Sequence, residues 1–122
     1  MYTKIEGCQH VGSQWGFVMI VEMRTYSLKS GSLGEWLRLY EERGLPVHKQ
    51  ILGNLIGYFN TEIGDINEVI HMWGFDSFED RQRRRGILSQ NADWRDFLSL
   101  ALPLIQTQQI KLLNCATFSP IR

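Results

Sequence analysis

The sequence predicts a single α+β domain in which a four-stranded antiparallel sheet carries its helices on one face. Side chains alternate between the two faces of a strand over Met19–Leu28 and again over Gln109–Ala116. A hairpin signal lies within Asn54–Phe75, and apolar residues recur at helical spacing before and after it. The resulting order, β-α-β-β-α-β, is that of the split βαβ or ferredoxin-like arrangement.

The hairpin is centred on the Gly-Asp pair at positions 64 and 65. Glycine supplies the positive φ that a tight reversal needs. A loop of two or four residues would pair Tyr58 with His71 and Ile56 with Trp73. A three-residue loop would shift this register, so the faces below depend on the loop length.

This register gives the hairpin two unlike faces. The apolar face is expected to be the core beneath the helices, and it holds Leu55, Gly57, Phe59, Ile70 and Met72. The other face holds a phenol, an imidazole and an indole, which belong to Tyr58, His71 and Trp73.

The helices are predicted from their start signals. Ser32 and Glu35 have the spacing of a capping box, and the glycine and proline of residues 44–46 interrupt the helix that follows. Ser77 is expected to cap the second helix, and Asn91 precedes a third.

Composition sets the broad class of the protein. The chain has 122 residues, enough for one domain, which we place at residues 19–122 after a poorly ordered extension at residues 1–18. The formal net charge is zero, so no global charge directs the chain to nucleic acid. We expect no membrane insertion, because no apolar run approaches the roughly 20 residues that a spanning helix needs. Two distant cysteines without a secretory signal predict a cytoplasmic protein.

A sheet that carries both helices on one face leaves its other face uncovered. We expect that open face to hold the polar and aromatic set, which is too aromatic for plain solvated surface and too polar for core. A face of this kind meets a second copy of the chain, a ligand, or both. The candidate pocket or dimer-face residues are Glu22, Arg24, Tyr26, Tyr58, His71 and Trp73.

Several blocks of the chain resemble the NIPSNAP family. These are MIVEMRTY, LGNLIGYFNTEIGDINEVIHMWGFDSFEDRQRRR and ATFSP, in that order, within the span from Met19 to Ile121. The resemblance implies a ferredoxin-like subunit that forms a homodimer sheet to sheet, as a dimeric α/β barrel, and a family without a settled enzymatic activity. Related barrels include cofactor-independent monooxygenases, which makes chemistry in the barrel an alternative at the level of fold analogy.

Each candidate residue has a structural and a functional interpretation. His71 is favoured as an imidazole bonded within the sheet or the interface, with a general base as the alternative. Glu22 and Arg24 would neutralise each other across the interface or bind a polar substrate. Tyr26 is favoured as interface packing. His48, beside an exposed lysine, is expected to be exposed, with the barrel mouth as the alternative.

The run of arginines at positions 81, 83, 84 and 85 favours a solvated or salt-bridged helix face over a nucleic-acid site. No spacing typical of metal ligands occurs, and we predict neither a metal nor a cofactor. Two hypotheses remain. The chain is either a homodimeric interaction or scaffolding module, or a barrel whose pocket binds or transforms a small organic ligand.

Overall fold

The computed structural model describes residues 19–122, so the extension predicted at residues 1–18 falls outside the described residues. Strands and helices follow one another in the predicted order. The elements are β2 (Ile20–Leu28), α2 (Leu33–Leu39), the π-helical segment η2 (Tyr40–Gly44), α3 (Leu45–Ile51), β3 (Asn54–Asn60), β4 (Glu68–Phe75), α4 (Phe78–Ser89), α5 (Ala92–Ala101), the 3-10 turn η3 (Leu102–Leu104) and β5 (Ile105–Asn114).

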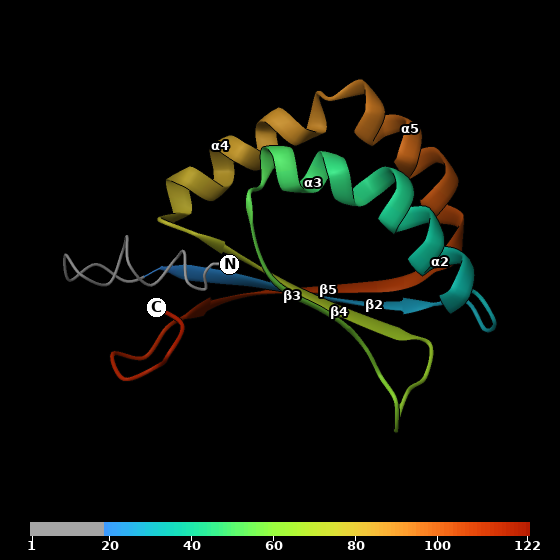
Figure 1. Cartoon of the computed structure of the whole chain (residues 1–122), viewed down its shortest axis with the longest axis horizontal. Helices are drawn as coiled ribbons and strands as arrows, with labels where there is room; N and C mark the ends of the chain where they lie inside the picture. The colour runs from blue at the N-terminus through green and yellow to red at the C-terminus, as the bar shows by residue number, and fades with distance from the viewer. Residues whose placement is uncertain (1–18) are drawn as a thin grey trace.

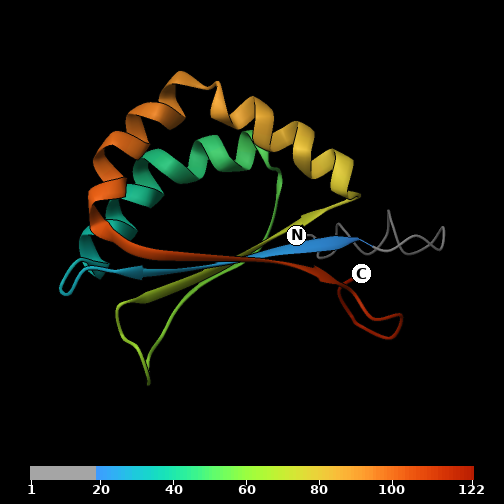
Figure 2. The ribbon, with the colours of Figure 1, turned by 180° about the vertical axis from the view of Figure 1, so that it is seen from behind.

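The four strands form one antiparallel sheet in the order β3-β4-β2-β5. Figures 1 and 2 show that the helices all lie on the same side of this sheet, as an arch over it, while the opposite face carries no helix. The α+β, ferredoxin-like βαββαβ fold predicted from the sequence is therefore confirmed. Among residues 19–122, no helix combines the length and apolar character needed to cross a membrane.

The hairpin between β3 and β4 follows the predicted register only in part. Tyr58 lies opposite His71, as predicted, and Gly64 has the positive φ of 126° that its loop position requires. Trp73, however, lies opposite Leu55 and not Ile56, because an extra residue enters the ladder between Leu55 and Gly57. Such a bulge reverses the facing of the strand residues before it. The prediction that Leu55 shares the face of Met72 is thus wrong.

Two of the three predicted helix starts have the side-chain cap that the sequence indicates. The Ser77 hydroxyl accepts a hydrogen bond of 3.0 Å from the Asp80 backbone N–H, and Asn91 caps α5 in the same way. Ser32 makes no side-chain cap, so the predicted capping box is wrong. Its backbone is helical, with φ −93° and ψ −4°, whereas a capping side chain normally leaves an extended backbone.

The largest correction concerns the two faces of the sheet. The register places all six candidate residues on one face, but that face lies beneath the helices and is not the open one. Tyr26 packs edge-on against Trp36 of α2, with ring centroids 5.6 Å apart. Glu22 is bound by arginines of α4, and its exposed fraction is 0%. The prediction of an uncovered polar and aromatic face is therefore wrong.

The open face is the apolar one. Along the central strands, the side chains of this face alternate with those that lie beneath the helices. They include Val21, Met23, Ile70 and Met72. On the edge strand β3, Phe59 pairs with Ile70 on this face and is 51% exposed. The C-terminal segment runs under one end of the sheet (Figure 1). Side chains of this segment and of the sheet line an apolar groove there.

Candidate functional site

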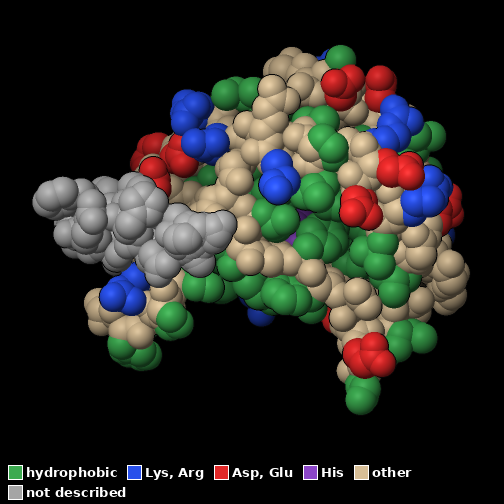
Figure 3. Space-filling view, viewed as in Figure 1, with side chains coloured by type: hydrophobic (Ala, Val, Ile, Leu, Met, Phe, Trp, Pro, Cys, Tyr) green, Lys and Arg blue, Asp and Glu red, His purple; other side chains and the backbone are tan. Residues whose placement is uncertain are grey.

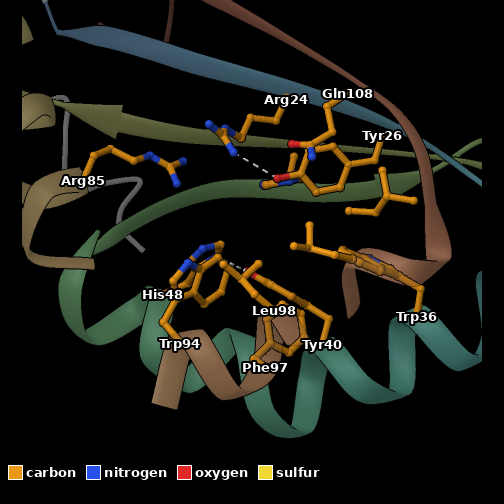
Figure 4. Close-up of a pocket in the computed structure, with 13 residues that line it drawn as sticks. Arg24, Tyr26, Trp36, Tyr40, His48, Arg85, Trp94, Phe97, Leu98 and Gln108 are labelled. Atoms are coloured by element: carbon orange, nitrogen blue, oxygen red, sulfur yellow. Dashed lines mark hydrogen bonds between the residues drawn. The ribbon is translucent and has the colours of Figure 1, made fainter. Parts of the chain in front are cut away.

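A pocket of about 200 Å³ lies between the helices and the covered face of the sheet. Arg24, Tyr26 and His71 line it from the sheet, while Trp36 and His48 line it from the helices. Figure 4 shows Arg24 and Tyr26 on the sheet side of the pocket and His48 and Trp36 on the helix side, with Arg85 at one end and Trp36 at the other. Figure 3 shows a small area of histidine near the centre of this view, with hydrophobic side chains around it and basic and acidic side chains nearby.

His71 presents one nitrogen that has no bonding partner in the described chain. The Trp73 indole N–H donates a hydrogen bond of 2.8 Å to Nδ1 of His71, and Tyr58 stacks on the ring at 4.7 Å. A neutral ring that accepts at Nδ1 must carry its proton on Nε2. Nε2 is buried, and no atom of residues 19–122 is hydrogen-bonded to it. Burial and the charge of Arg24 lower the pKa of His71 to about 3, so the ring is neutral at pH 7.

His48 forms a second buried imidazole in the same pocket, and the prediction that it is exposed is wrong. Its ring stacks on Trp94 at 4.1 Å, and its Nδ1 lies 2.7 Å from the Tyr40 hydroxyl. Its Nε2 also lacks a hydrogen-bonding partner within residues 19–122. Burial, together with the charge of Arg85, lowers the pKa of His48 to about 2.

The π-helical segment explains why His48 faces inward. A π turn inserts one residue into the helix, which rotates the following residues by roughly 100° relative to an uninterrupted α-helix. Gly44 closes this segment, and a Cβ atom there would lie 2.7 Å from Cδ1 of Tyr40 and 3.0 Å from Cζ of Phe97. A residue without a side chain therefore lets the Tyr40 ring pack close to the helix and reach His48.

Glu22 is the one buried carboxylate beside this pocket within the described chain. Arg85 donates to Oε1 from Nη2 at 2.7 Å and from Nε at 3.2 Å. Arg81 and Arg24 donate to Oε2 at 2.8 and 3.1 Å. Burial by itself would raise the pKa of Glu22, but the charges of Arg85 and Arg24 outweigh it and hold the pKa at about 2.

The arginine run of α4 is divided between two carboxylates. Arg81 and Arg85 bind Glu22, while Arg84 and the 61% exposed Arg83 pair with Asp80. The interpretation of this run as a salt-bridged face is consistent with these contacts, although half of them reach into the interior. No group of three or more metal-binding side chains occurs in the part of the chain that the structure describes.

The NIPSNAP family model matches residues 21–120. The chain belongs to the NIPSNAP family. It is 32% identical over 92 residues to a NipSnap homologue of Dictyostelium discoideum, covering 75% of this chain and 40% of that protein. It is also 32% identical to the human NipSnap homologue 3A, covering 75% of this chain and 37% of that one. The chain thus spans less than half the length of these relatives.

Solved structures agree with this NIPSNAP membership. A NIPSNAP family protein from Agrobacterium tumefaciens has a TM-score of 0.83 and 44% identity, covering 85% of this chain and 91% of that one. A putative antibiotic biosynthesis monooxygenase from Nitrosomonas europaea has a TM-score of 0.62 at 6% identity, covering 83% and 93%. At that identity the second likeness shows the fold alone.

Among the residues that line this NIPSNAP pocket, sequence reasoning did not name Trp36, Tyr40 or Arg85 as site residues, and it gave His48 a place at the barrel mouth only as an alternative. One signal could have found Arg85. Arg81 and Arg85 are four positions apart, so they share a helix face, and a strand glutamate flanked by apolar residues needs such partners. His48 offered no equivalent signal, because its direction depends on the π turn.

Proposed function

We propose that this NIPSNAP domain binds a small organic molecule in the pocket between its helices and its sheet. The observation that carries the proposal is the pair of buried imidazoles, each with an Nε2 atom that bonds to nothing else in residues 19–122. A buried polar atom without a partner costs about 1–3 kcal/mol, so native proteins rarely keep two of them in one place without a function. A ligand with hydrogen-bonding groups would satisfy both.

Binding is favoured over catalysis by the state of these histidines. A general base works best when its pKa lies near the working pH, and the pKa values of His48 and His71 lie at about 2 and 3. Both rings are therefore weak bases at neutral pH, and they are better suited to hydrogen bonding than to proton abstraction.

Ligand-observed NMR with a library of small polar aromatic molecules tests the proposal. We expect binders whose signals weaken with the unmodified chain and recover with His71→Leu. The matched control is Gln50→Leu, an exposed position on α3 that should leave binding unchanged. Binding that is lost equally in both variants, or that never appears with the unmodified chain, would contradict the proposal.

We further propose that the domain forms a homodimer through its open sheet face. The support is the apolar character of that face, where Met23, Ile70 and Met72 stand on the central strands without helices over them. Large apolar patches on soluble proteins mark sites of association. A second copy of the chain supplies a surface of the same chemistry, as a two-fold interface requires.

Light scattering after size exclusion tests the homodimer. Met72→Glu places a charge at the centre of the proposed interface and should convert dimer to monomer, with circular dichroism showing that the subunit stays folded. Gln50→Glu adds the same charge to the helix layer and should leave the dimer intact. A Met72→Glu protein that remains dimeric would overturn this arrangement.

A further inference from the structure

We propose that the ligand of this pocket is a small carboxylate with an aromatic or aliphatic body, bound with its anionic group at Arg24 and Arg85. The inference rests on the proposed function and names the class of molecule that the pocket takes. It is carried by the charge around Glu22, by the hydrogen-bond donors left over there, and by the apolar far end of the pocket.

The charges at one end of the pocket do not balance. Arg24, Arg81 and Arg85 surround the single carboxylate of Glu22, and no other acidic side chain of residues 19–122 is ion-paired with them. Their side chains are only 14–16% exposed, so solvent screens them weakly. This end of the pocket therefore carries excess positive charge in a partly desolvated setting, which favours an anion.

The groups that Arg24, Arg85 and His71 leave available to a ligand are donors. Within residues 19–122, Arg24 uses Nε for Glu22 and Nη1 for the Tyr26 hydroxyl, which leaves its Nη2 group. Among the same described residues, Arg85 uses Nε and Nη2 for Glu22, which leaves its Nη1 group. Nε2 of His71 carries a proton, because Nδ1 accepts from Trp73. A ligand that satisfies these groups must offer acceptors, and a carboxylate offers two oxygens that match a guanidinium fork.

Most of the remaining pocket lining is apolar or aromatic. Trp36, Phe97 and Leu98 line it on the side away from Arg85. Tyr40, His48 and Gln108 add neutral polar groups to the lining, and no acidic side chain is among the lining residues. An amine would therefore meet like charge without a counter-ion, and an inorganic anion would leave the aromatic walls unfilled. The volume of about 200 Å³ is below the 300–1,000 Å³ typical of pockets for drug-sized ligands, so the body is about the size of one ring.

The test compares acids with their matched amides on the unmodified chain. The pairs are benzoate with benzamide, phenylacetate with phenylacetamide, and 3-phenylpropionate with its amide, with acetate and phenethylamine as further probes. A charge-assisted contact predicts that at least one acid binds about tenfold or more tightly than its amide, while acetate and the amine bind weakly. Dissociation constants from titration calorimetry or NMR supply the comparison.

Arg85→Gln identifies the group responsible. It should weaken the acid about tenfold or more and leave the amide unchanged. Arg83→Gln is the matched control, because it removes the same charge from the same helix at a position that points to solvent and pairs with Asp80. The acid-to-amide ratio needs no variant, so the test stands even if Arg85→Gln does not fold.

The two proposals fail in different ways. If an amide binds as tightly as its acid, or if Arg85→Gln weakens both equally, the carboxylate inference is overturned while a binding pocket remains. If no member of any pair binds to the unmodified chain, the carboxylate inference falls, and the wider library screen then decides whether the pocket binds any small molecule.

Discussion

The two faces of the sheet differ in a way that inverts the usual expectation. The face beneath the helices carries a glutamate, an arginine, tyrosines and a histidine among its apolar side chains. The face without helices carries aliphatic side chains such as Met23 and Met72 on the central strands, beside Thr25 and Lys111. In an isolated domain the aliphatic face would be the natural core. Here the covered face is buried because α2, η2, α3 and α4 bring partners for its polar groups, from the Trp36 indole that donates to Tyr58 to the arginines that bind Glu22.

The difference between the two faces shows that a sheet face with polar side chains can be buried when those side chains have hydrogen-bonding or charged partners. A buried charge is tolerated when it is paired and hydrogen-bonded, and Glu22 accepts from three arginines. The apolar face has no helix to cover it, which is why we assign it to a second copy. The covered face, with its pocket, is the one that we propose for a ligand.

The largest expected effect on the stability of the covered face is that of replacing Glu22. Glu22→Gln removes the single counter-charge of three partly buried arginines, and breaking such a buried set costs about 3–5 kcal/mol of unfolding free energy. Urea denaturation followed by circular dichroism measures the loss. Glu42→Gln is the matched control, since Glu42 pairs with Arg38 at the surface and should change stability by less than about 1 kcal/mol. Equal effects of the two substitutions would mean that the covered face is not held by its ion pairs.

Local features of this fold could be predicted from the sequence. The Gly-Asp turn, the pairing of Tyr58 with His71, the Ser77 cap and the order of the elements depend on residues within a few positions of one another or on one ladder. These are the features for which short-range sterics and hydrogen bonds suffice.

The site could be predicted only in part, because the choice of which sheet face lies beneath the helices depends on contacts between residues far apart in the sequence. Alternation shows that Glu22, Arg24 and Tyr26 share a face, but it does not say which face the helices cover. That choice depends on Arg81 and Arg85, which lie 59 and 63 residues from Glu22. The inward direction of the His48 side chain depends on a π turn, and the sequence carries no clear local signal for the residue that this turn adds.

The histidines of the covered face predict a loss of stability in acid. Their folded pKa values of about 2 and 3 lie below the ordinary 6.5, so the unfolded chain takes up protons first as the pH falls. Their contribution is complete above pH 6.5 and declines below it. Each buried histidine should lower the unfolding free energy by about 2 kcal/mol between pH 6.5 and 5, at about 1.4 kcal/mol per pH unit.

Urea denaturation at pH 7.5, 6 and 5 checks this prediction. His48→Gln should remove about half of the acid-dependent loss, whereas the exposed Gln50→Ala should retain all of it. Glu22 contributes little to this range, because its folded and ordinary pKa values of about 2 and 4.5 both lie below pH 5. A wild-type stability that stays constant from pH 7.5 to 5 would show that the imidazoles are not buried in their neutral form.

The smallest expected effect tests how α4 is held in place over the covered face. Ser77→Ala removes the hydroxyl that accepts from the Asp80 N–H, and loss of such a cap costs about 1 kcal/mol. Ser32→Ala is the matched control, because the Ser32 side chain caps nothing and its loss should change stability by less than about 0.5 kcal/mol. Thermal or urea unfolding distinguishes the two.

Since α4 carries Arg81 and Arg85, Ser77→Ala should also lessen the cost in unfolding free energy of Glu22→Gln when the two substitutions are combined. Strict additivity of Ser77→Ala and Glu22→Gln would show that the cap does not help to position the arginines at Glu22.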